Sequence, residues 1–361
     1  MTTIAVLGAG AIGLGMAAQF SHQAHEVRLF GRSLTTGSCE IHAQGALEWR
    51  GPVAAYAEIS GAVAGAEVVV LCVPGDGQKA MIDALVPVLE DGQTVVISAQ
   101  YSLSALYLSK RLSERGLKDV PIVALATTML TGRRTSAHSV RVLSIRKEYG
   151  FALYAHHRAA ETAALIRALS GKDLTQVAMT EIAFGNANPI AHVPNALCNL
   201  TRIELGEDWS NYGKMTASVC ALIEKLDAER CRIAGMFGAA PIPFAEHLHR
   251  SFGAPLGSVF EMAQAIGETR SGLNGPNAMS SRYITEDVPY GLVPVAFLAE
   301  VAGEEAPAHT AFVTLLSTAC GRDFGAENDL LAGLSLRGRP LAEIRQKLEA
   351  GWTGWPFCKR P

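Results

Sequence analysis

The chain has 361 residues, of which 49% are hydrophobic and 18% charged, and its formal net charge is −3. This composition excludes a disordered protein, and a weakly negative charge without a run of Lys or Arg argues against a nucleic-acid-binding surface. Because the length exceeds that of one ordinary hydrophobic core, we expect two domains.

The ends of the chain and its cysteines indicate the compartment. The start, Met1-Thr2-Thr3, runs into an apolar stretch without a basic segment, so we expect no signal peptide. The longest apolar stretch, residues 288–303, contains Glu300 and is shorter than the ~20 residues that cross a bilayer, which predicts a buried helix. Seven scattered cysteines are typical of reduced thiols, with disulfides or a metal site as alternatives. We therefore expect a soluble, cytoplasmic protein without a membrane partner.

Apolar, β-branched runs alternate with helical patterns through the first half of the chain. In chain order the pattern predicts strand 4–7, helix 11–25, strand 26–30, hairpin 39–59, strand 67–73, helix 78–89, strand 93–98, helix 104–116, strand 120–127, strand 140–154 and helix 157–170. Such alternation favours a largely parallel sheet covered by helices on both faces.

Helical patterns dominate the second half, where β-branched runs fade. We therefore predict an α/β Rossmann-type dinucleotide-binding domain over residues 1–183. A mainly α-helical substrate and catalytic domain is predicted over residues 184–361. The tail contains Trp352 and Trp355 and is expected to dock on the body of the protein or on another subunit, so a homodimer is one expected assembly.

A glycine-rich turn follows the first predicted strand and opens the first predicted helix. It reads Gly8-Ala9-Gly10-Ala11-Ile12-Gly13, the G-x-G-x-x-G spacing. The first glycine permits a tight turn, the second lets a pyrophosphate approach the backbone, and the third lets the helix pack on the strand. Free amides of Ala11, Ile12 and the next residues would face the phosphates. We predict a dinucleotide site here; the alternative is a merely tight turn.

The end of the second strand bears on the choice between NADP and NAD. Sites for NAD usually carry a carboxylate there, whereas this strand ends with Arg32-Ser33. A guanidinium suits a 2′-phosphate, so we predict NADP, with NAD as the alternative; Arg32 as a plain surface residue is the other interpretation. Pro74 lies at the carboxyl end of another strand and is expected at the cofactor, or in a plain turn. Thr127-Thr128 and Arg133-Arg134 are weaker candidates at the same edge.

A polar stripe crosses an otherwise apolar segment at the start of the second domain. Asn188, His192, Asn195 and Asn199 recur at helical spacing. A lone histidine is often structural, but histidine is also the natural proton donor beside a hydride carrier. Pro194 favours a helix start near residue 193, which would place His192 close to a helix N-terminus.

A second polar segment, residues 277–291, precedes the long apolar helix. Asp287 could orient His192 by accepting its second N–H, and Arg282 could bind a carboxylate with two hydrogen bonds. The alternative is helix capping by Thr285, Glu286 and Asp287 with a surface ion pair to Arg282. The residues alone leave both interpretations open.

These two segments together resemble the opine dehydrogenase family, especially the octopine synthase type. The motifs that carry the resemblance are Asn-Pro-x-x-His at 188–192, Arg-Tyr-x-x-Glu-Asp-x-Pro at 282–289, the run at 143–147 and the run at 227–230. The resemblance implies reductive condensation of an amino acid with a 2-oxo acid, often pyruvate, with NAD(P)H. It also implies that His192 is the acid–base residue, Asp287 its partner and Arg282 a carboxylate ligand. Asn188 is expected in the substrate site.

Two other functions stay open on the residues alone. One is a simple oxo-acid reductase of the ketopantoate reductase or glycerol-3-phosphate dehydrogenase type, which would use a helical-domain lysine. Lys214 and Lys225 are the only lysines between residues 173 and 346, and neither lies in a polar motif. The other is a non-catalytic dinucleotide sensor, which would need the glycines but not the His, Asp and Arg set.

Overall fold

The computed structural model describes residues 1–270 and 272–352, which form two compact units. The first unit consists of Met1–Ile182 and the segment that begins at Arg345, and the second is Ala183–Ile344. The prediction had assigned every residue after 183 to the helical domain. The segment from Arg345 joins the first unit instead because the Tyr154 hydroxyl donates to the Leu348 carbonyl at 2.7 Å.

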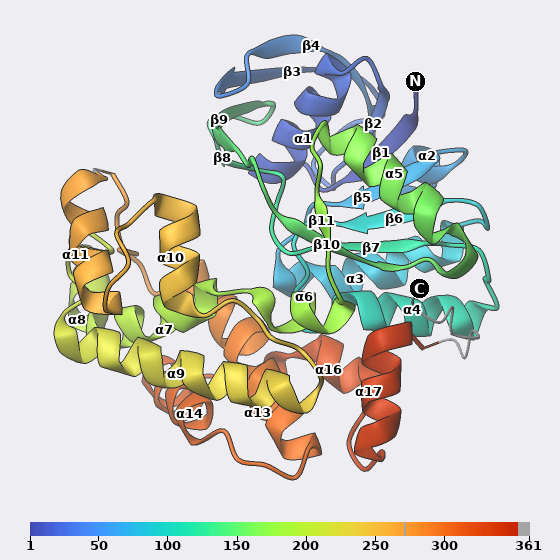
Figure 1. Ribbon diagram of the computed structural model, residues 1–361. Helices are drawn as coiled ribbons and strands as arrows, with labels where there is room; N and C mark the ends of the chain where they lie inside the picture. The colour runs from blue at the N-terminus through green and yellow to red at the C-terminus, as the bar shows by residue number, and fades with distance from the viewer. Residues whose placement is uncertain (271, 353–361) are drawn as a thin grey trace. The chain divides into compact units, whose positions relative to one another are not determined.

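The first unit is built on one large mixed sheet with helices on both faces (Figure 1). Its strands are β1 Thr3–Leu7, β2 Glu26–Phe30, β3 Gly37–Gly45, β4 Trp49–Tyr56, β5 Val68–Leu71, β6 Thr94–Ile97, β7 Ile122–Leu125, β8 Leu130–Arg134, β9 Ser139–Ile145, β10 Gly150–Tyr154 and β11 Thr175–Gln176. Its helices are α1 Ala11–His22, α2 Ile59–Val63, α3 Gly75–Leu85, η1 Val86–Val88, α4 Ser104–Arg115, η2 His156–Arg158 and α5 Ala159–Ser170.

The order of the strands defines where a ligand binds. The sheet runs β11-β10-β7-β6-β5-β1-β2-β4-β3-β9-β8, and its central strands β4, β2, β1, β5, β6 and β7 are parallel. From β1 the chain passes through α1 to β2 on one side of β1. After β4 and α2 it returns to β5 on the other side of β1. In open α/β sheets the ligand crevice lies at the carboxyl ends of the strands at this switch point. The predicted parallel sheet is confirmed.

Two strand predictions need correction. Residues 140–154 form two strands rather than one: β9 pairs with β3 and β8, whereas β10 runs antiparallel to β7. The predicted hairpin became β3 and β4, and β8 and β11 were not predicted. Short edge strands carry little sequence signal because their pairing is decided by distant partners.

The core of the first unit packs around α1, the helix that follows the glycine-rich turn. One face of the sheet shares a buried cluster with Phe20 of α1 and Ile166 of α5, while α3 and α4 pack together on the other side. At Gly15 an added Cβ would lie 2.7 Å from the Leu130 side chain, so β8 packs directly on α1. Helix α1 is therefore held between the sheet and its β8–β9 extension.

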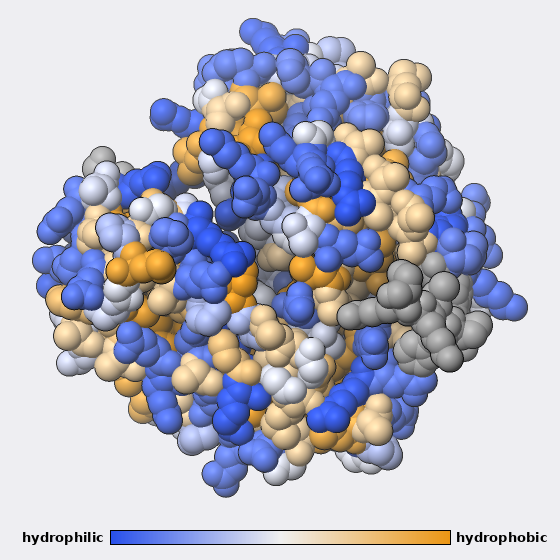
Figure 2. All heavy atoms as spheres, in the orientation of Figure 1, coloured by the Kyte–Doolittle hydropathy of each residue, from blue (hydrophilic) through white to orange (hydrophobic). Residues whose placement is uncertain are grey.

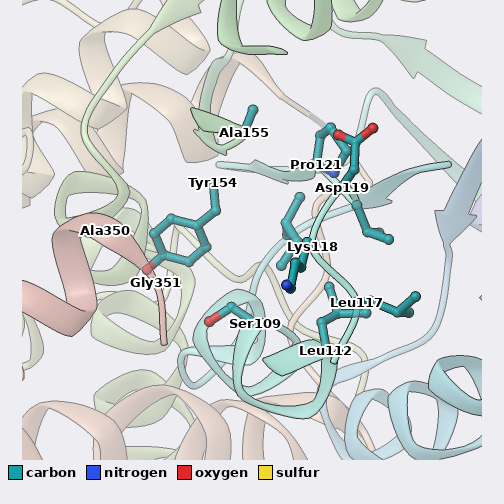
Figure 3. A pocket seen from close by; sticks show the side chains of 12 residues that line it. Ser109, Leu112, Leu117, Lys118, Asp119, Pro121, Tyr154, Ala155, Ala350 and Gly351 are labelled. Atoms are coloured by element: carbon teal, nitrogen blue, oxygen red, sulfur yellow. The ribbon is translucent and has the colours of Figure 1, made fainter. Parts of the chain in front are cut away.

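A small hollow marks the place where the C-terminal segment meets the first unit. Figure 3 shows Tyr154 beside Ala350 and Gly351, with Ser109 of α4 nearby and Pro121 farther along the lining. The amide of Trp352 donates to Ser109 Oγ at 2.8 Å, so the expected docking of this tryptophan is observed on its own chain. Pro121 precedes β7, so the hollow lies at the opposite end of that strand from the ligand crevice. Trp355 and Cys358 lie outside the described residues.

The second unit is helical, as predicted. Its elements are α6 Met179–Gly185, which begins in the first unit, α7 Asn188–Cys198, α8 Leu200–Glu204, α9 Ala217–Met236, α10 Phe244–Phe252, α11 Val259–Thr269, α12 Arg282–Thr285, the π-helical turn η3 Val288–Leu292, α13 Val293–Val301, α14 Pro307–Cys320, α15 Phe324–Glu327, α16 Asp329–Leu334 and the start of α17 Leu341–Ala350, whose residues from Arg345 belong to the first unit. The predicted buried helix at 288–303 is confirmed as α13, preceded by a π-helical turn. Helix α7 packs against α9 and α14.

No helix among the described residues is long and apolar enough to cross a bilayer. On the face drawn in Figure 2, hydrophilic residues dominate and the apolar ones form small, scattered patches.

A buried ionic network joins α9 to α14 behind α7. The Glu229 carboxylate accepts hydrogen bonds from the amides of Ala308 and His309, at the start of α14, and contacts His309 Nδ1 at 2.6 Å. Next to it, Arg230 is fully buried and donates to Asp227. An anionic side chain at a helix N-terminus stabilises that end, so Glu229 holds α14 against α9.

This network predicts a loss of stability in mild acid. Burial lowers the pKa of His309 from its ordinary 6.5. Burial alone would raise the pKa of Glu229, but its hydrogen bonds from His309 and the α14 amides lower it overall. The unfolded chain therefore binds more protons as the pH falls below 6.5, and the free energy of unfolding decreases.

The His309→Asn variant keeps an N–H toward Glu229 but does not titrate. We expect urea unfolding of this variant, measured between about pH 7 and about pH 5, to depend less steeply on pH than that of the wild type. Equal slopes for the two proteins would contradict the assignment of this pH dependence to His309.

Candidate active site

The loop between β1 and α1 has the backbone that the glycine spacing predicts. Gly8 adopts φ +117°, and a Cβ there would lie 2.6 Å from the Cys72 carbonyl oxygen. A Cβ on Gly13 would lie 1.7 Å from the Gly8 oxygen, so the helix packs on the turn only with glycine. At Gly10, the N-cap of α1, an added Cβ meets nothing within 4 Å.

That open space at Gly10 fits a dinucleotide. Ala11 and Ile12 begin α1, and the first amides of a helix have no partner inside it. An anion placed over Gly10 would therefore meet free N–H groups and the positive end of the helix dipole. The residues present fit a pyrophosphate, and no side chain of the loop fills its place.

A second loop faces this one across the switch point. Pro74 follows β5 and is the N-cap of α3, and the neighbouring Val73 would touch a Cβ placed on Gly8. The Val73–Pro74 loop therefore lies against the glycine loop, where the sequence had expected Pro74. Behind it, the buried Gln78 donates to the Ala99 carbonyl at 3.0 Å.

The segment after β6 is strained, and sequence reasoning missed it. Ala99, Ser102 and Leu103 have φ of 72°, 46° and 64°, a left-handed conformation in residues that are not glycine. Each such residue costs of order 1–3 kcal/mol, and such strain clusters at functional sites. The segment follows a parallel strand adjacent to β5, at the edge of the sheet that binds ligands. It contains no glycine, so the sequence carried no local signal for it.

The structure places the two residues predicted to bind a 2′-phosphate beyond the end of β2. Arg32 and Ser33 directly follow the end of β2 and are exposed. Neither makes a side-chain hydrogen bond or ion pair within the part of the chain that the structure describes. Among the weaker candidates, Thr128 follows β7 and donates to the Leu130 carbonyl. Arg133 and Arg134 end β8, the last strand in the order, and the pairings make β8 run in the same direction as the central strands. Their place at the ligand edge of the sheet stays a prediction.

Helix α7, which carries His192, begins earlier than predicted. It starts at Asn188, with Pro189 in its first turn, and the Asn186 side chain accepts the Asn188 amide at 3.1 Å. Pro194 therefore lies inside the helix, and His192 is one turn from its start. The prediction of a start near residue 193 is wrong because Pro189, rather than Pro194, occupies the first-turn position that favours proline.

The structure brings His192 and Asp287 together inside the second unit. His192 Nδ1 lies 2.7 Å from Asp287 Oδ2, and the two side chains are 10% and 1% exposed. With Nδ1–H donated to the carboxylate, Nε2 is the nitrogen left to exchange a proton with a ligand. The other carboxylate oxygen, Oδ1, is buried and has no hydrogen-bond partner among the described residues.

Tyr283 covers one face of the same imidazole. The two rings are parallel to within 7°, and their centroids are 3.6 Å apart. Sequence reasoning did not single out this tyrosine, although it is four residues before Asp287. On a helix that spacing places two side chains on one face, and this was the available signal.

A close backbone approach joins α7 to the π-helical turn that follows Asp287. A Cβ added to Gly291 would lie 2.2 Å from Pro189 Cγ. Only glycine lets the turn approach the first turn of α7 at this distance. The geometry of the His192–Asp287 pair therefore depends on this contact between the elements that carry the two residues.

The polar stripe on α7 divides into two groups. Asn188 lies one turn before His192 on the same face and is half-buried. Asn195 instead donates to both the side chain and the carbonyl of Asn211, and Asn199 donates back to Asn195 at the end of the helix. The second group serves the fold, so only Asn188 and His192 remain candidates for the site.

Arg282 is the most exposed member of the predicted set. Its side chain is 57% exposed, and its Nη1 lies 4.0 Å from Glu286 Oε2 on the next turn. Ser281 caps the short helix. Both interpretations of this segment are thus partly realised: Asp287 contacts His192, while Arg282 pairs with Glu286.

Comparison with known proteins now adds to the geometry. Residues 176–320 match the family model for the α-helical domain of NAD/NADP octopine/nopaline dehydrogenase. Residues 3–124 match the NAD-binding domain of 6-phosphogluconate dehydrogenase. An opine dehydrogenase from Arthrobacter sp. (strain 1C) is 28% identical over 96% of this chain and 99% of its own. The helical domain therefore belongs to the octopine/nopaline dehydrogenase family, and the whole chain is similar to an opine dehydrogenase.

Solved structures show the same fold. An octopine dehydrogenase with NADH and L-arginine has a TM-score of 0.77 at 13% identity and covers 99% of this chain and 100% of its own. A yersinopine dehydrogenase with NADP⁺ has a TM-score of 0.70 at 17% identity and covers 97% and 98%. With its matched NAD-binding and helical domains and its full-length similarity to an opine dehydrogenase, the chain is an NAD(P)-dependent oxidoreductase, as predicted. Lys214 and Lys225, which the reductase alternative would need, are exposed.

The glycine loop supplies a matched pair of variants. We expect Gly10→Ala to fold normally, because its Cβ meets open space, but to bind NADPH at least about 10-fold more weakly, because the methyl lies in the path of the pyrophosphate. Gly13→Ala should be destabilised itself, because its Cβ overlaps the Gly8 oxygen.

Thermal unfolding and fluorescence titration with NADPH separate the two effects. If Gly10→Ala bound NADPH as tightly as the wild type, the pyrophosphate would not lie over this residue.

Proposed function

We propose that this chain is an opine dehydrogenase that condenses the amino group of an amino acid with a 2-oxo acid and reduces the product with NADPH. The observation that carries this proposal is the buried pair of His192 and Asp287 within the domain matched to the octopine/nopaline dehydrogenases. Octopine dehydrogenase has been solved with NADH and L-arginine and with NADH and pyruvate. We propose pyruvate as the 2-oxo acid here.

The net reaction joins the two substrates into a secondary amine dicarboxylate and releases one water. The amine nitrogen attacks the ketone carbon and gives one of its own protons to the oxygen. His192 Nε2–H donates the second proton, so that the carbon–oxygen bond breaks and water leaves a protonated carbon–nitrogen double bond. Asp287 accepts the hydrogen bond from Nδ1–H. Its negative charge balances the positive charge of the imidazolium until Nε2 releases its proton. Bound NADPH supplies the hydride that reduces the resulting carbon–nitrogen double bond.

Arg282 and Asn188 are proposed to bind substrate. A guanidinium binds a carboxylate through two parallel hydrogen bonds, and its exposure leaves Arg282 accessible to a ligand. Asn188 projects from the same helical face as His192, where its amide can accept and donate. Both substrates carry a carboxylate, so a fixed cation near the histidine would orient the reacting carbon.

We also propose a cytoplasmic location, which the state of the thiols supports. The six cysteines in the described part of the chain are all free, which suits the cytoplasmic location predicted from the sequence.

The test of the proposed activity is a requirement for two substrates. Oxidation of NADPH should need both an amino acid and a 2-oxo acid, which a screen of amino acids against pyruvate and 2-oxoglutarate measures. The His192→Ala variant should lose roughly 10²–10⁴-fold in kcat, whereas the control His22→Ala, at an exposed histidine of α1, should not.

A double variant tests the pair itself. Because Asp287 acts through His192, adding Asp287→Asn to His192→Ala should lower kcat little further. Turnover with the oxo acid alone would identify a simple reductase, and cofactor binding without any turnover would identify a sensor.

Cofactor preference is tested at Arg32. Arg32→Asp should raise the KM for NADPH about 10- to 100-fold, because a hydrogen bond to a charged group contributes about 1.5–3 kcal/mol. The KM for NADH should change little. Arg141→Asp, at an exposed arginine of β9, is the control for added negative charge. An unchanged preference in Arg32→Asp would remove this residue from the cofactor site.

A further inference from the structure

The imidazole of His192 is held on two sides by a single helical turn. Asp287 contacts its Nδ1 edge, and the ring of Tyr283 lies flat on its face. His192 itself lies inside α7, so its Cα is fixed by a different element. A side chain held at its base, one edge and one face has little freedom left to rotate.

The local sequence explains how one turn presents both groups. Ser281 is the N-cap of α12 and its hydroxyl accepts the Tyr283 amide, so the helix begins at Arg282, one residue before the tyrosine. The helical hydrogen bonds continue from Glu286 to the Arg282 carbonyl and from Tyr290 to the Glu286 carbonyl. Tyr283 and Asp287 therefore stand one turn apart on the same face.

The ring of Tyr283, rather than its hydroxyl, makes this contact. Burial raises the pKa of the phenol to about 12, although the Arg282 charge lowers it and the Asp287 charge raises it by a smaller amount. A phenol that holds its proton so firmly does not exchange it near neutral pH. The face of the tyrosine ring can still stabilise a cation, because a positive charge over it is attracted by the ring quadrupole.

The stacking geometry favours the charged imidazole. Two neutral rings prefer an offset or edge-to-face arrangement, whereas a centroid separation of 3.6 Å at 7° leaves little offset. An imidazolium over the tyrosine face gains a cation–π attraction that a neutral ring lacks. The contact therefore suits the form of His192 that donates a proton.

We propose that Tyr283 is a positioning residue that fixes the plane of the His192 imidazole, so that Nε2 stays directed at the substrate while Asp287 holds Nδ1. The role rests on the proposed function, because it gives Nε2 a proton to deliver. The stack itself exists without substrate and can be measured without turnover.

Two substitutions separate the ring from the hydroxyl. Tyr283→Phe keeps the stack, so kcat should stay within about 3-fold of the wild type. Tyr283→Leu removes the stack, and kcat should fall about 10²-fold, because a misplacement of about 1 Å of a reacting group has that effect. The KM for the 2-oxo acid should change little, since proton transfer acts in the transition state.

A control measures the general effect of losing a buried ring. Phe184→Leu removes one ring of the aromatic pair with Phe237 in the same unit, without touching His192. Its kcat should remain close to that of the wild type. If Tyr283→Leu does not fold, Tyr283→Met carries the same expectations.

Nuclear magnetic resonance of the substrate-free protein provides the structural readout. With labelled histidine, the ring protons of His192, identified by their loss in His192→Ala, should be shifted upfield by the tyrosine ring. The shift should persist in Tyr283→Phe and disappear in Tyr283→Leu.

Three outcomes would overturn the proposal. The first is an unchanged His192 shift in Tyr283→Leu, which would mean that the rings do not stack in solution. The second is a normal kcat in Tyr283→Leu despite a lost shift. The third is an equal loss of kcat in the phenylalanine and leucine variants, which would assign the effect to the hydroxyl. If the wild type condenses no pair of substrates, the proposed function fails, whereas the resonance experiment still decides whether Tyr283 holds the ring.

Discussion

The buried contact between His192 and Asp287 is the constraint around which the helical unit is organised. The two residues are separated by 95 positions in the chain, and both are almost inaccessible to water. A carboxylate in such a place requires a partner, and Oδ1 of Asp287 has none among the described residues. The imidazole of His192 is therefore the main group that stabilises the charge of the Asp287 carboxylate.

Several local features serve that contact. Asn186 and Pro189 start α7 one turn before the histidine. Ser281 caps the start of α12, and the helical turn that follows places Tyr283 and Asp287 on one face. Behind them, Glu229 holds α14 against α9, and both helices pack on α7. Each feature follows an ordinary rule of helix formation, and their combination produces a site.

The parts of the structure that could be predicted are those with a local cause. The turn from Gly8 to Gly13 and the alternation of strands and helices follow from sequence periodicity and from positions that tolerate only glycine. The pairing of His192 with Asp287 was open on the residues alone and was suggested by family resemblance.

Other features depend on partners far away in the chain. The role of Pro194 was misjudged because two prolines competed for one first-turn position, and only the fold shows which one occupies it. The strain at Ala99 and Leu103 and the stack of Tyr283 arise from tertiary packing, which no local pattern encodes. The division of the asparagines on α7 likewise depends on Asn211, on a separate segment.

The missing side chain at Gly291 also bears on how such enzymes diversify. Pro189 occupies the space that any larger residue would need, so a substitution there would push the carboxylate and the imidazole apart without altering either group. Substitutions that change the choice of substrate must therefore lie at other positions. A library that varies the surface around the site while keeping Gly291 and Pro189 would preserve the joint between α7 and the π-helical turn.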